Sequence, residues 1–145
     1  MDIVKYKPEY SIQILDVWEK SVLATHHFLQ KDDFLEIKAM LQTFDFTQLD
    51  VSCLIKDDKV VGFIGVHEQK IEMLFLSPDN IGKGYGQRMT AFAINNFHIN
   101  KVDVNEQNTS AKLFYEKMGF EVYDRTEFDD MGKNYPILKM KLKQI

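Results

Sequence analysis

The sequence predicts one mixed α/β domain over residues 1–145, with a central, mostly antiparallel sheet of about six or seven strands flanked by about four helices. Two observations lead to this class. Residues 51–76 contain three apolar runs joined by short polar turns, which is typical of antiparallel strands. From residue 84 onward, helical periodicity alternates with strand-like runs, which is typical of a sheet covered by helices. No Pro/Gly-rich linker divides the chain.

The N-terminal third is expected to contain a short strand at residues 3–7 and two helices. The first helix is placed at residues 9–25, because Ile14, Trp18 and Val22 recur every four residues and form one apolar row. The second helix is expected to start at a cap made by Asp32 or Asp33 and to run to about residue 41.

The middle of the chain is expected to form three strands, at residues 51–55, 60–66 and 71–76, with tight turns at 56–59 and 68–69. Pro78 ends the third strand because proline has no backbone donor for a ladder hydrogen bond. Cys53, the single cysteine, lies inside the first of these apolar runs. A buried structural thiol is therefore a better interpretation than a nucleophile.

The last part is expected to alternate helices and strands: a helix at about residues 84–97, a strand at 101–105, a second helix that Asn108 caps, and strands at 120–128 and 135–142. Residues 129–133, with Gly132, form the turn between the last two strands. The second helix has an apolar row at helical spacing, made of Ala111, Phe114, Tyr115 and Met118.

Composition narrows the function classes. The chain has 18 basic and 22 acidic residues, a formal net charge of −4, which argues against a dedicated nucleic-acid partner. No apolar stretch approaches the ~20 residues of a membrane span, so no membrane partner is expected. The first residues lack the apolar core of a signal peptide, and a lone cysteine fits a reducing compartment, so a cytoplasmic location is expected.

A glycine-rich loop between a strand and a helix is the first chemical motif. Alternating glycines allow a ligand to approach the backbone closely, and the helix start offers unpaired N–H groups at the positive end of the helix dipole. Together they predict a site for a pyrophosphate, although a flexible turn is the alternative. The loop consists of Ile81, Gly82, Lys83, Gly84, Tyr85, Gly86 and Gln87.

Two other phosphate-binding loops fit less well. The P-loop pattern G-x-x-x-x-G-K-[ST] is absent. The dinucleotide fingerprint G-x-G-x-x-G would need Gly or Ala where Gln87 stands, although Asp103 lies at a suitable distance for a ribose contact. The glycine loop also follows three antiparallel strands rather than the first strand of a βαβ unit. Nucleotide-dependent oxidoreduction is therefore the weaker alternative.

A second motif, Asn108-x-x-Ala111-x-x-Phe114-Tyr115-x-x-x-Gly119-Phe120, follows the glycine loop after one strand. The pair of motifs, in this order, resembles the acetyl-CoA-binding segments of the GNAT acetyltransferases. Similarity to the YjaB-like bacterial subgroup extends through residues 21–29, 105–108 and 129–136. The resemblance implies that acetyl-CoA is the cosubstrate, that no metal is needed, and that acetyl passes directly to a primary amine of a small molecule or peptide.

The resemblance also implies residue roles. Pantetheine would lie along Leu74, Phe75 and Leu76, and the glycine loop with Asn108 would complete the CoA site. Ile81 departs from the pattern, because GNAT proteins usually carry Arg or Gln there. Weaker CoA binding is expected, with Lys83 or Arg88 supplying charge.

Tyr115 is the candidate general acid for the leaving thiolate, since a phenol stays protonated at neutral pH. The alternative is that it only packs in its apolar row. Glu72 interrupts an apolar strand and is the candidate general base, as a partly buried carboxylate, or is an ordinary solvent-facing residue.

His26, which follows the first helix beside His27, is the candidate acceptor-pocket residue and can itself act as a base near neutral pH. The identity of the base stays open between Glu72, a histidine and water. A homodimer is possible, and a non-catalytic acyl-CoA-binding module of the same fold remains the alternative function.

Overall fold

The computed structural model describes residues 1–143, within which seven strands form one sheet and four α-helices flank it. This confirms the predicted fold class. The elements are β1 (Asp2–Lys5), α1 (Ser11–Thr25), α2 (Lys31–Thr43), β2 (Asp50–Lys56), β3 (Lys59–His67), β4 (Lys70–Leu76), α3 (Tyr85–Phe97), β5 (Lys101–Asn105), α4 (Thr109–Lys117), β6 (Phe120–Thr126) and β7 (Ile137–Leu142).

The strand order is β1-β2-β3-β4-β5-β7-β6, and every neighbouring pair is antiparallel except β4 and β5. Tight turns connect β2 to β3 and β3 to β4. Asp57, Asp58, Glu68 and Gln69 all have positive φ there. Two successive residues of positive φ give the turn twist that matches twisted antiparallel strands. These turns fix the meander of the first half of the sheet.

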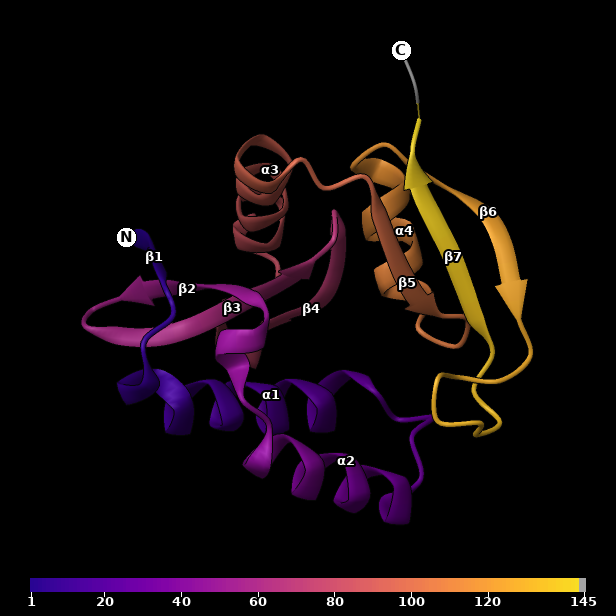
Figure 1. Cartoon of the computed structure of the whole chain (residues 1–145), viewed down its shortest axis with the longest axis horizontal. Helices are drawn as coiled ribbons and strands as arrows, with labels where there is room; N and C mark the ends of the chain where they lie inside the picture. The colour runs from indigo at the N-terminus through magenta and orange to yellow at the C-terminus, as the bar shows by residue number, and fades with distance from the viewer. Residues whose placement is uncertain (144–145) are drawn as a thin grey trace.

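The helices cover both faces of the sheet. In Figure 1, α1 and α2 lie on one side of β1–β4, while α3 lies on the opposite side and α4 packs behind β5 and β7. Each face has its own buried core: Ile14, Trp18 and Val22 of α1 lie in one, and Met89 and Ala93 of α3 lie in the other. The predicted apolar row of α1 is therefore confirmed. No helix in residues 1–143 is long and apolar enough to cross a membrane.

Cys53 belongs to the core beneath α1 and is fully buried. Burial raises the pKa of its thiol to about 12, because a thiolate there would lose its hydration. The side chain stays a neutral thiol at neutral pH and is structural, as predicted.

The start of α2 differs from the prediction. The residue that precedes the helix is Gln30, in extended conformation and without a side-chain cap, so neither Asp32 nor Asp33 is the cap. Both carboxylates lie in the first turn, where negative charge interacts favourably with the helix dipole. Asp33 is engaged by residues about 100 positions later in the chain, which sequence spacing could not show.

The last two strands are shorter than predicted: β6 ends at Thr126 and β7 begins at Ile137. Asp129 accounts for part of the difference. Its side chain accepts hydrogen bonds from the backbone N–H groups of Met131 and Lys133, which turns the chain away from the sheet. Residues 127–136 therefore form a longer loop than the predicted 129–133 turn.

The parallel contact between β4 and β5 is limited to the pairs Lys70 with Lys101 and Ile71 with Val102. Immediately afterwards β4 has a bulge: its register against β3 passes from Ile71–Val66 to Met73–Gly65, so Glu72 has no partner. A bulge bends a strand and increases its twist. Beyond Glu72 the two strands separate, and the β5-facing edge of residues 73–76 has no strand partner.

Candidate active site

The gap between β4 and β5 is the centre of the candidate site. Two adjoining cavities occupy this region: an inter-strand cavity of about 130 Å³, lined by β4 and β5, and an outer cavity of about 510 Å³, which reaches Ile81 and Gly86 at the glycine loop. The two cavities share six lining residues: His26, Leu74, Phe75, Asn108, Ala111 and Tyr115. Four of the six were singled out by the sequence as ligand-binding and one, Tyr115, as catalytic.

The glycine loop has an open backbone. Gly82 and Gly84 have φ of +83° and +81°, and a side-chain carbon added at either would meet no atom within 4 Å. Gly84 immediately precedes α3 and offers no side-chain cap. The N–H groups of the first turn of α3 are therefore without a side-chain acceptor. An open, left-handed backbone at the start of a 13-residue helix is suited to an anionic group.

Gly86 has a different role from the other two glycines. A side-chain carbon there would lie 3.3 Å from Cζ of Phe114 and 3.7 Å from Cδ1 of Leu76. Its lack of a side chain lets α3 pack closely against α4 and the end of β4. This brings the glycine loop and the helix that carries Tyr115 to the same cavity.

Asn108 caps α4, as predicted. Its side-chain oxygen accepts a hydrogen bond of 3.1 Å from the backbone N–H of Ala111. The side-chain amide nitrogen remains as a donor on the rim of both cavities. Asn108 therefore fixes the start of the helix and also lines the site.

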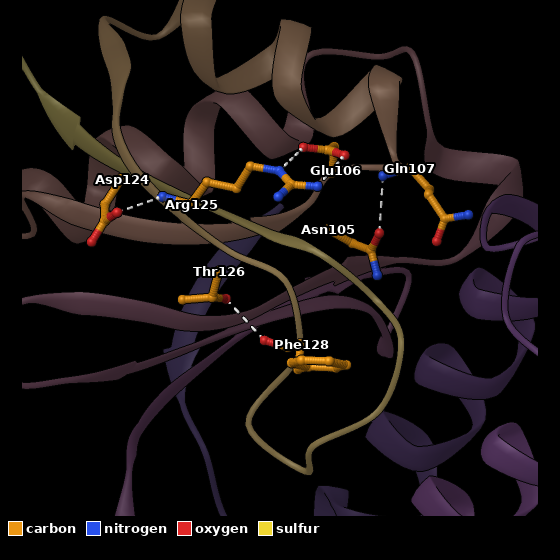
Figure 2. A network of polar contacts seen from close by, with 7 residues as sticks. All are labelled: Asn105, Glu106, Gln107, Asp124, Arg125, Thr126 and Phe128. Atoms are coloured by element: carbon orange, nitrogen blue, oxygen red, sulfur yellow. Dashed lines mark hydrogen bonds and ion pairs between the residues drawn. The ribbon is translucent and has the colours of Figure 1, made fainter.

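Side-chain hydrogen bonds hold the loop between β5 and α4 in place. Figure 2 shows Arg125 of β6 reaching Glu106, with Nε and one terminal nitrogen at 2.5 and 3.1 Å from the two carboxylate oxygens. The side-chain oxygen of Asn105 accepts from the backbone N–H of Gln107 at 2.9 Å. A two-pronged Arg–carboxylate pair fixes orientation as well as distance. Arg125 was not predicted, because it belongs to none of the motifs in the sequence.

Tyr115 is buried on the inner side of α4, with its ring edge-on to Phe114 and Phe120 at centroid distances of 5.0 and 5.5 Å. Burial raises the pKa of its hydroxyl well above the ordinary value of 10.0, so it is protonated throughout the neutral range. Its ring belongs to the core, and the residue also lines both cavities. The packing interpretation is therefore confirmed, and the role as general acid stays a prediction.

Glu72 lines the inter-strand cavity at the bulge, but its side chain is exposed rather than partly buried as expected. The bulge explains the exposure, because the extra residue is left outside the regular pairing of β3 and β4. Asp103 of β5 lines the same cavity and is paired with Lys70 at 2.7 Å. Within residues 1–143, no three His, Cys, Asp or Glu side chains are grouped to hold a metal ion.

His26 lies at the end of α1 and lines both cavities. Its ring lies 5.3 Å from that of Phe28 and 6.3 Å from that of Phe75, measured between centroids. Burial, reinforced by the neighbouring His27, lowers its pKa below the ordinary value of 6.5. The imidazole is therefore neutral at pH 7.

A group of polar side chains ties the start of α2 to the loop between β6 and β7. The hydroxyl of Tyr135 donates to Asp33 at 2.5 Å and accepts from the backbone N–H of Gln30 at 3.0 Å. Lys133 lies 2.8 Å from both Asp33 and Glu36. We call these five residues the clasp. The sequence indicated residues 129–136 only by resemblance and did not pair them with α2.

The clasp also sets the charge states of its members. Hydrogen bonds from Lys133 and Tyr135 lower the pKa of Asp33, and the two carboxylates raise the pKa of Lys133. The ring of Tyr135 lies 6.3 Å from Phe28, which in turn contacts His26. The clasp therefore supports the segment between α1 and α2 that borders the candidate site.

Comparison with known proteins agrees with this geometry. Residues 19–143 match the model of the acetyltransferase (GNAT) domain. The chain is 34% identical over 141 residues to the peptidyl-lysine N-acetyltransferase YjaB of Salmonella typhimurium, covering 97% of each protein. It is 33% identical to the protein of the same name from Escherichia coli K12, covering 97% of this chain and 95% of that one. The predicted resemblance to the YjaB-like subgroup is confirmed.

Solved structures give the same result. The solution structure of apo YjaB from Escherichia coli aligns with a TM-score of 0.90 at 32% identity, covering 99% of this chain and 98% of that one. The PaiA N-acetyltransferase of Thermoplasma acidophilum, solved in complex with coenzyme A, aligns with a TM-score of 0.71 at 22% identity and supports the fold. It covers 99% of this chain and 100% of that one. The chain belongs to the GNAT family of acetyl-CoA-dependent acetyltransferases.

Proposed function

We propose that this protein transfers the acetyl group of acetyl-CoA directly to the side-chain amine of a lysine in a peptide or protein. The observation that carries the proposal is the pair of adjoining cavities, which connects the open glycine loop to Tyr115 and to the unpaired edge of β4. The YjaB relatives are named peptidyl-lysine N-acetyltransferases, which supports a lysine acceptor over a small-molecule amine.

The residues present fit coenzyme A. Gly82 and Gly84 leave open space at the start of α3, where backbone N–H groups would bind the pyrophosphate. The backbone of residues 73–76 offers hydrogen-bonding groups that no β5 residue uses, which suits the amides of pantetheine. When bound, acetyl-CoA supplies an activated acyl thioester. A backbone N–H on the same edge would polarise its carbonyl, a contribution of about 2.7–4 kcal/mol in other acyl transfers.

Tyr115 is proposed to donate its hydroxyl proton to the sulfur as the carbon–sulfur bond breaks. Its raised pKa makes the isolated phenol a weaker acid. However, the buried environment that raises this pKa also raises the pKa of a thiol beside it, since both anions lose hydration there. Burial therefore shifts both pKa values in the same direction, and the phenol keeps its proton at every neutral pH.

Glu72 is proposed to attract the lysine ammonium group to the cavity. Its carboxylate is exposed at the bulge and lines the inter-strand cavity, so it is within reach of both solvent and the site. An exposed carboxylate is ordinarily ionised at neutral pH and steers cations over a Debye length of about 8 Å at physiological salt. This role of Glu72 does not include removing the proton from the ammonium group.

The proposal is tested with the full chain, acetyl-CoA and an N-terminally blocked peptide that contains one lysine. We expect release of free thiol and an acetylated lysine by mass spectrometry. The control peptide carries arginine in place of that lysine and should release none. Thiol release with small amines but not with the peptide would contradict the lysine acceptor. Tight CoA binding without any thiol release would indicate the non-catalytic acyl-CoA-binding module.

A further inference from the structure

The contacts of Thr25 determine which nitrogen of His26 carries the proton. Oγ1 of Thr25 lies 2.7 Å from the backbone oxygen of Ser21 and 2.7 Å from Nδ1 of His26. A carbonyl oxygen only accepts hydrogen bonds, so the single hydroxyl proton of Thr25 is donated to Ser21. The contact with His26 is then a hydrogen bond only if Nδ1 is the donor. Nδ1 therefore holds the proton and Nε2 holds the lone pair.

The imidazole is also restrained on its flanks. The rings of Phe28 and Phe75 lie at 44° and 39° to it, and both contacts come from elements that border the cavities. Phe28 is itself supported by Tyr135 of the clasp. A neutral imidazole of fixed tautomer, held among aromatic rings at a cavity that also contains Tyr115, is a preorganised proton acceptor.

We infer that Thr25 and His26 form a proton-accepting pair, in which Nε2 of His26 takes the proton from the lysine ammonium group and Thr25 is the positioning residue. The inference rests on the proposed function and adds the residue that makes the amine nucleophilic. Other titratable groups line the cavities that His26 borders: His27, Lys31, Glu72, Asp103 and Tyr115.

Those neighbours fit the assignment less well. Asp103 is paired with Lys70, and Tyr115 is protonated in the neutral range. Lys31 carries a positive charge and has no lone pair to offer. His27 and Glu72 are exposed. His26 alone among these groups combines partial burial, a neutral charge state and a fixed tautomer.

Protons and electrons balance through this pair. The ammonium nitrogen loses one proton to Nε2, and its freed lone pair forms the carbon–nitrogen bond to the acyl carbon. The carbon–sulfur bond breaks, and the sulfur keeps the electron pair and takes the proton of Tyr115. A second proton leaves the new amide nitrogen for solvent. Solvent then reprotonates Tyr115 and removes the proton of His26, which gives a net release of one proton per turnover.

The test compares kcat/KM of wild type and His26→Gln on the lysine peptide from about pH 6.5 to 10. Free lysine loses its proton only near pH ~10.4. Without the acceptor, the rate at pH 7 should fall by about 10²–10⁴-fold. The deficit should shrink steadily as pH rises, because the amine then arrives deprotonated. His67→Gln removes an exposed imidazole elsewhere and should match wild type at every pH.

Thr25→Val and Thr25→Ser test the positioning role. Valine keeps the shape of threonine without the hydroxyl, so the rate should fall with the same pH signature but by less than in His26→Gln. Serine restores the hydroxyl and should restore the rate. Nitrogen NMR of the wild-type imidazole should show a protonated Nδ1 and an unprotonated Nε2, and Thr25→Val should populate the other tautomer.

Three results would overturn the assignment. A pH-dependent deficit in Glu72→Gln with a normal His26→Gln would move the base to the carboxylate. A protonated Nε2 in wild type would remove the lone pair on which the inference depends, even with normal turnover. A wild-type protein without turnover would instead overturn the proposed function, and with it the catalytic use of this pair.

Discussion

The two sides of the proposed active site are built in different ways. The donor side, formed by the glycine loop, the edge of β4 and the start of α4, depends on backbone features and on contacts within a few residues, such as the Asn108–Ala111 cap. The proposed acceptor side depends on contacts between residues 102 and 105 positions apart, because the hydroxyl of Tyr135 bonds to the side chain of Asp33 and to the backbone N–H of Gln30. In the proposed function, local backbone features bind CoA, whereas long-range side-chain contacts border the acceptor.

The difference matters because the two sides tolerate change differently. A backbone site is disrupted by one added side chain, since the N–H groups cannot move away from it. A single substitution in the clasp removes one of several side-chain contacts and leaves the others in place. We therefore expect substitutions on the donor side to abolish binding and substitutions on the acceptor side to weaken it by degrees.

The largest effect is expected for Gly84→Val. The branched side chain would fill the open space before α3, and CoA affinity should fall by more than about 100-fold, because close backbone approach is lost. Calorimetric titration with CoA measures this. Gly132→Val is the matched control, since Gly132 also has positive φ and open space but lies in the loop between β6 and β7. Equal CoA affinities in the two folded variants would contradict the loop assignment.

The second largest effect is expected for Tyr115→Phe. The ring and its contacts with Phe114 and Phe120 remain, so CoA affinity should change little. Loss of the proton donor should lower kcat by about 10²–10⁴-fold. The loss should shrink for acyl donors with a more acidic thiol, which need less protonation.

Tyr10→Phe, which removes the hydroxyl of a half-buried tyrosine beside the α1 core, is the control and should keep full activity. Wild-type turnover in Tyr115→Phe would leave the residue with a packing role alone. Steady-state thiol release on the lysine peptide separates these outcomes.

The clasp should show the graded response of the acceptor side. Tyr135→Phe removes the hydroxyl that joins Asp33 to Gln30. KM for the lysine peptide should rise by about two- to tenfold, the effect of one net hydrogen bond, while CoA affinity stays unchanged. Tyr123→Phe, at an exposed tyrosine of β6, should change neither quantity. A fall in CoA affinity in Tyr135→Phe would show that the two sides are not separable.

Lowering the pH should weaken the clasp, because Asp33 then becomes protonated. The pKa of Asp33 is lowered in the folded protein, so its contribution to stability is present above the ordinary value of 3.8 and disappears as pH falls through the folded value. The stability difference between wild type and Asp33→Asn should therefore be constant near pH 7 and shrink below about pH 4. Urea unfolding at several pH values measures it, and a difference that grew in acid would contradict the assigned charge state.

The smallest effect is expected for Ile81→Arg. Ile81 is 47% exposed at the edge of the outer cavity, so an arginine there would contact the pyrophosphate in partial solvent. An exposed ion pair contributes about 0–1 kcal/mol, which tightens CoA binding by at most about fivefold. Leu113→Arg adds the same charge on the exposed face of α4 and should have no effect. Weaker CoA binding in Ile81→Arg than in wild type would contradict the place of this residue in the CoA site.

The sequence by itself determined the fold class, the apolar row of α1, the glycine loop and the cap at Asn108. Each of these depends on residue identity and local spacing, such as the four-residue recurrence of Ile14, Trp18 and Val22. Only the tertiary structure decided the rest. The bulge at Glu72 depends on how β3 pairs with β4, and it left exposed a carboxylate that the strand pattern suggested was partly buried.

The contacts of Asp33 were likewise decided only by the tertiary structure. Its position suggested a helix cap, but it bonds instead to Lys133 and Tyr135, which lie beside it only in the tertiary structure. The tautomer of His26 likewise depends on a threonine hydroxyl whose single proton is committed to Ser21. Local periodicity fixes which residues face a core, because helices and strands have set repeats. Bulges, ion pairs and proton positions depend on distances between elements, which no repeat in the sequence specifies.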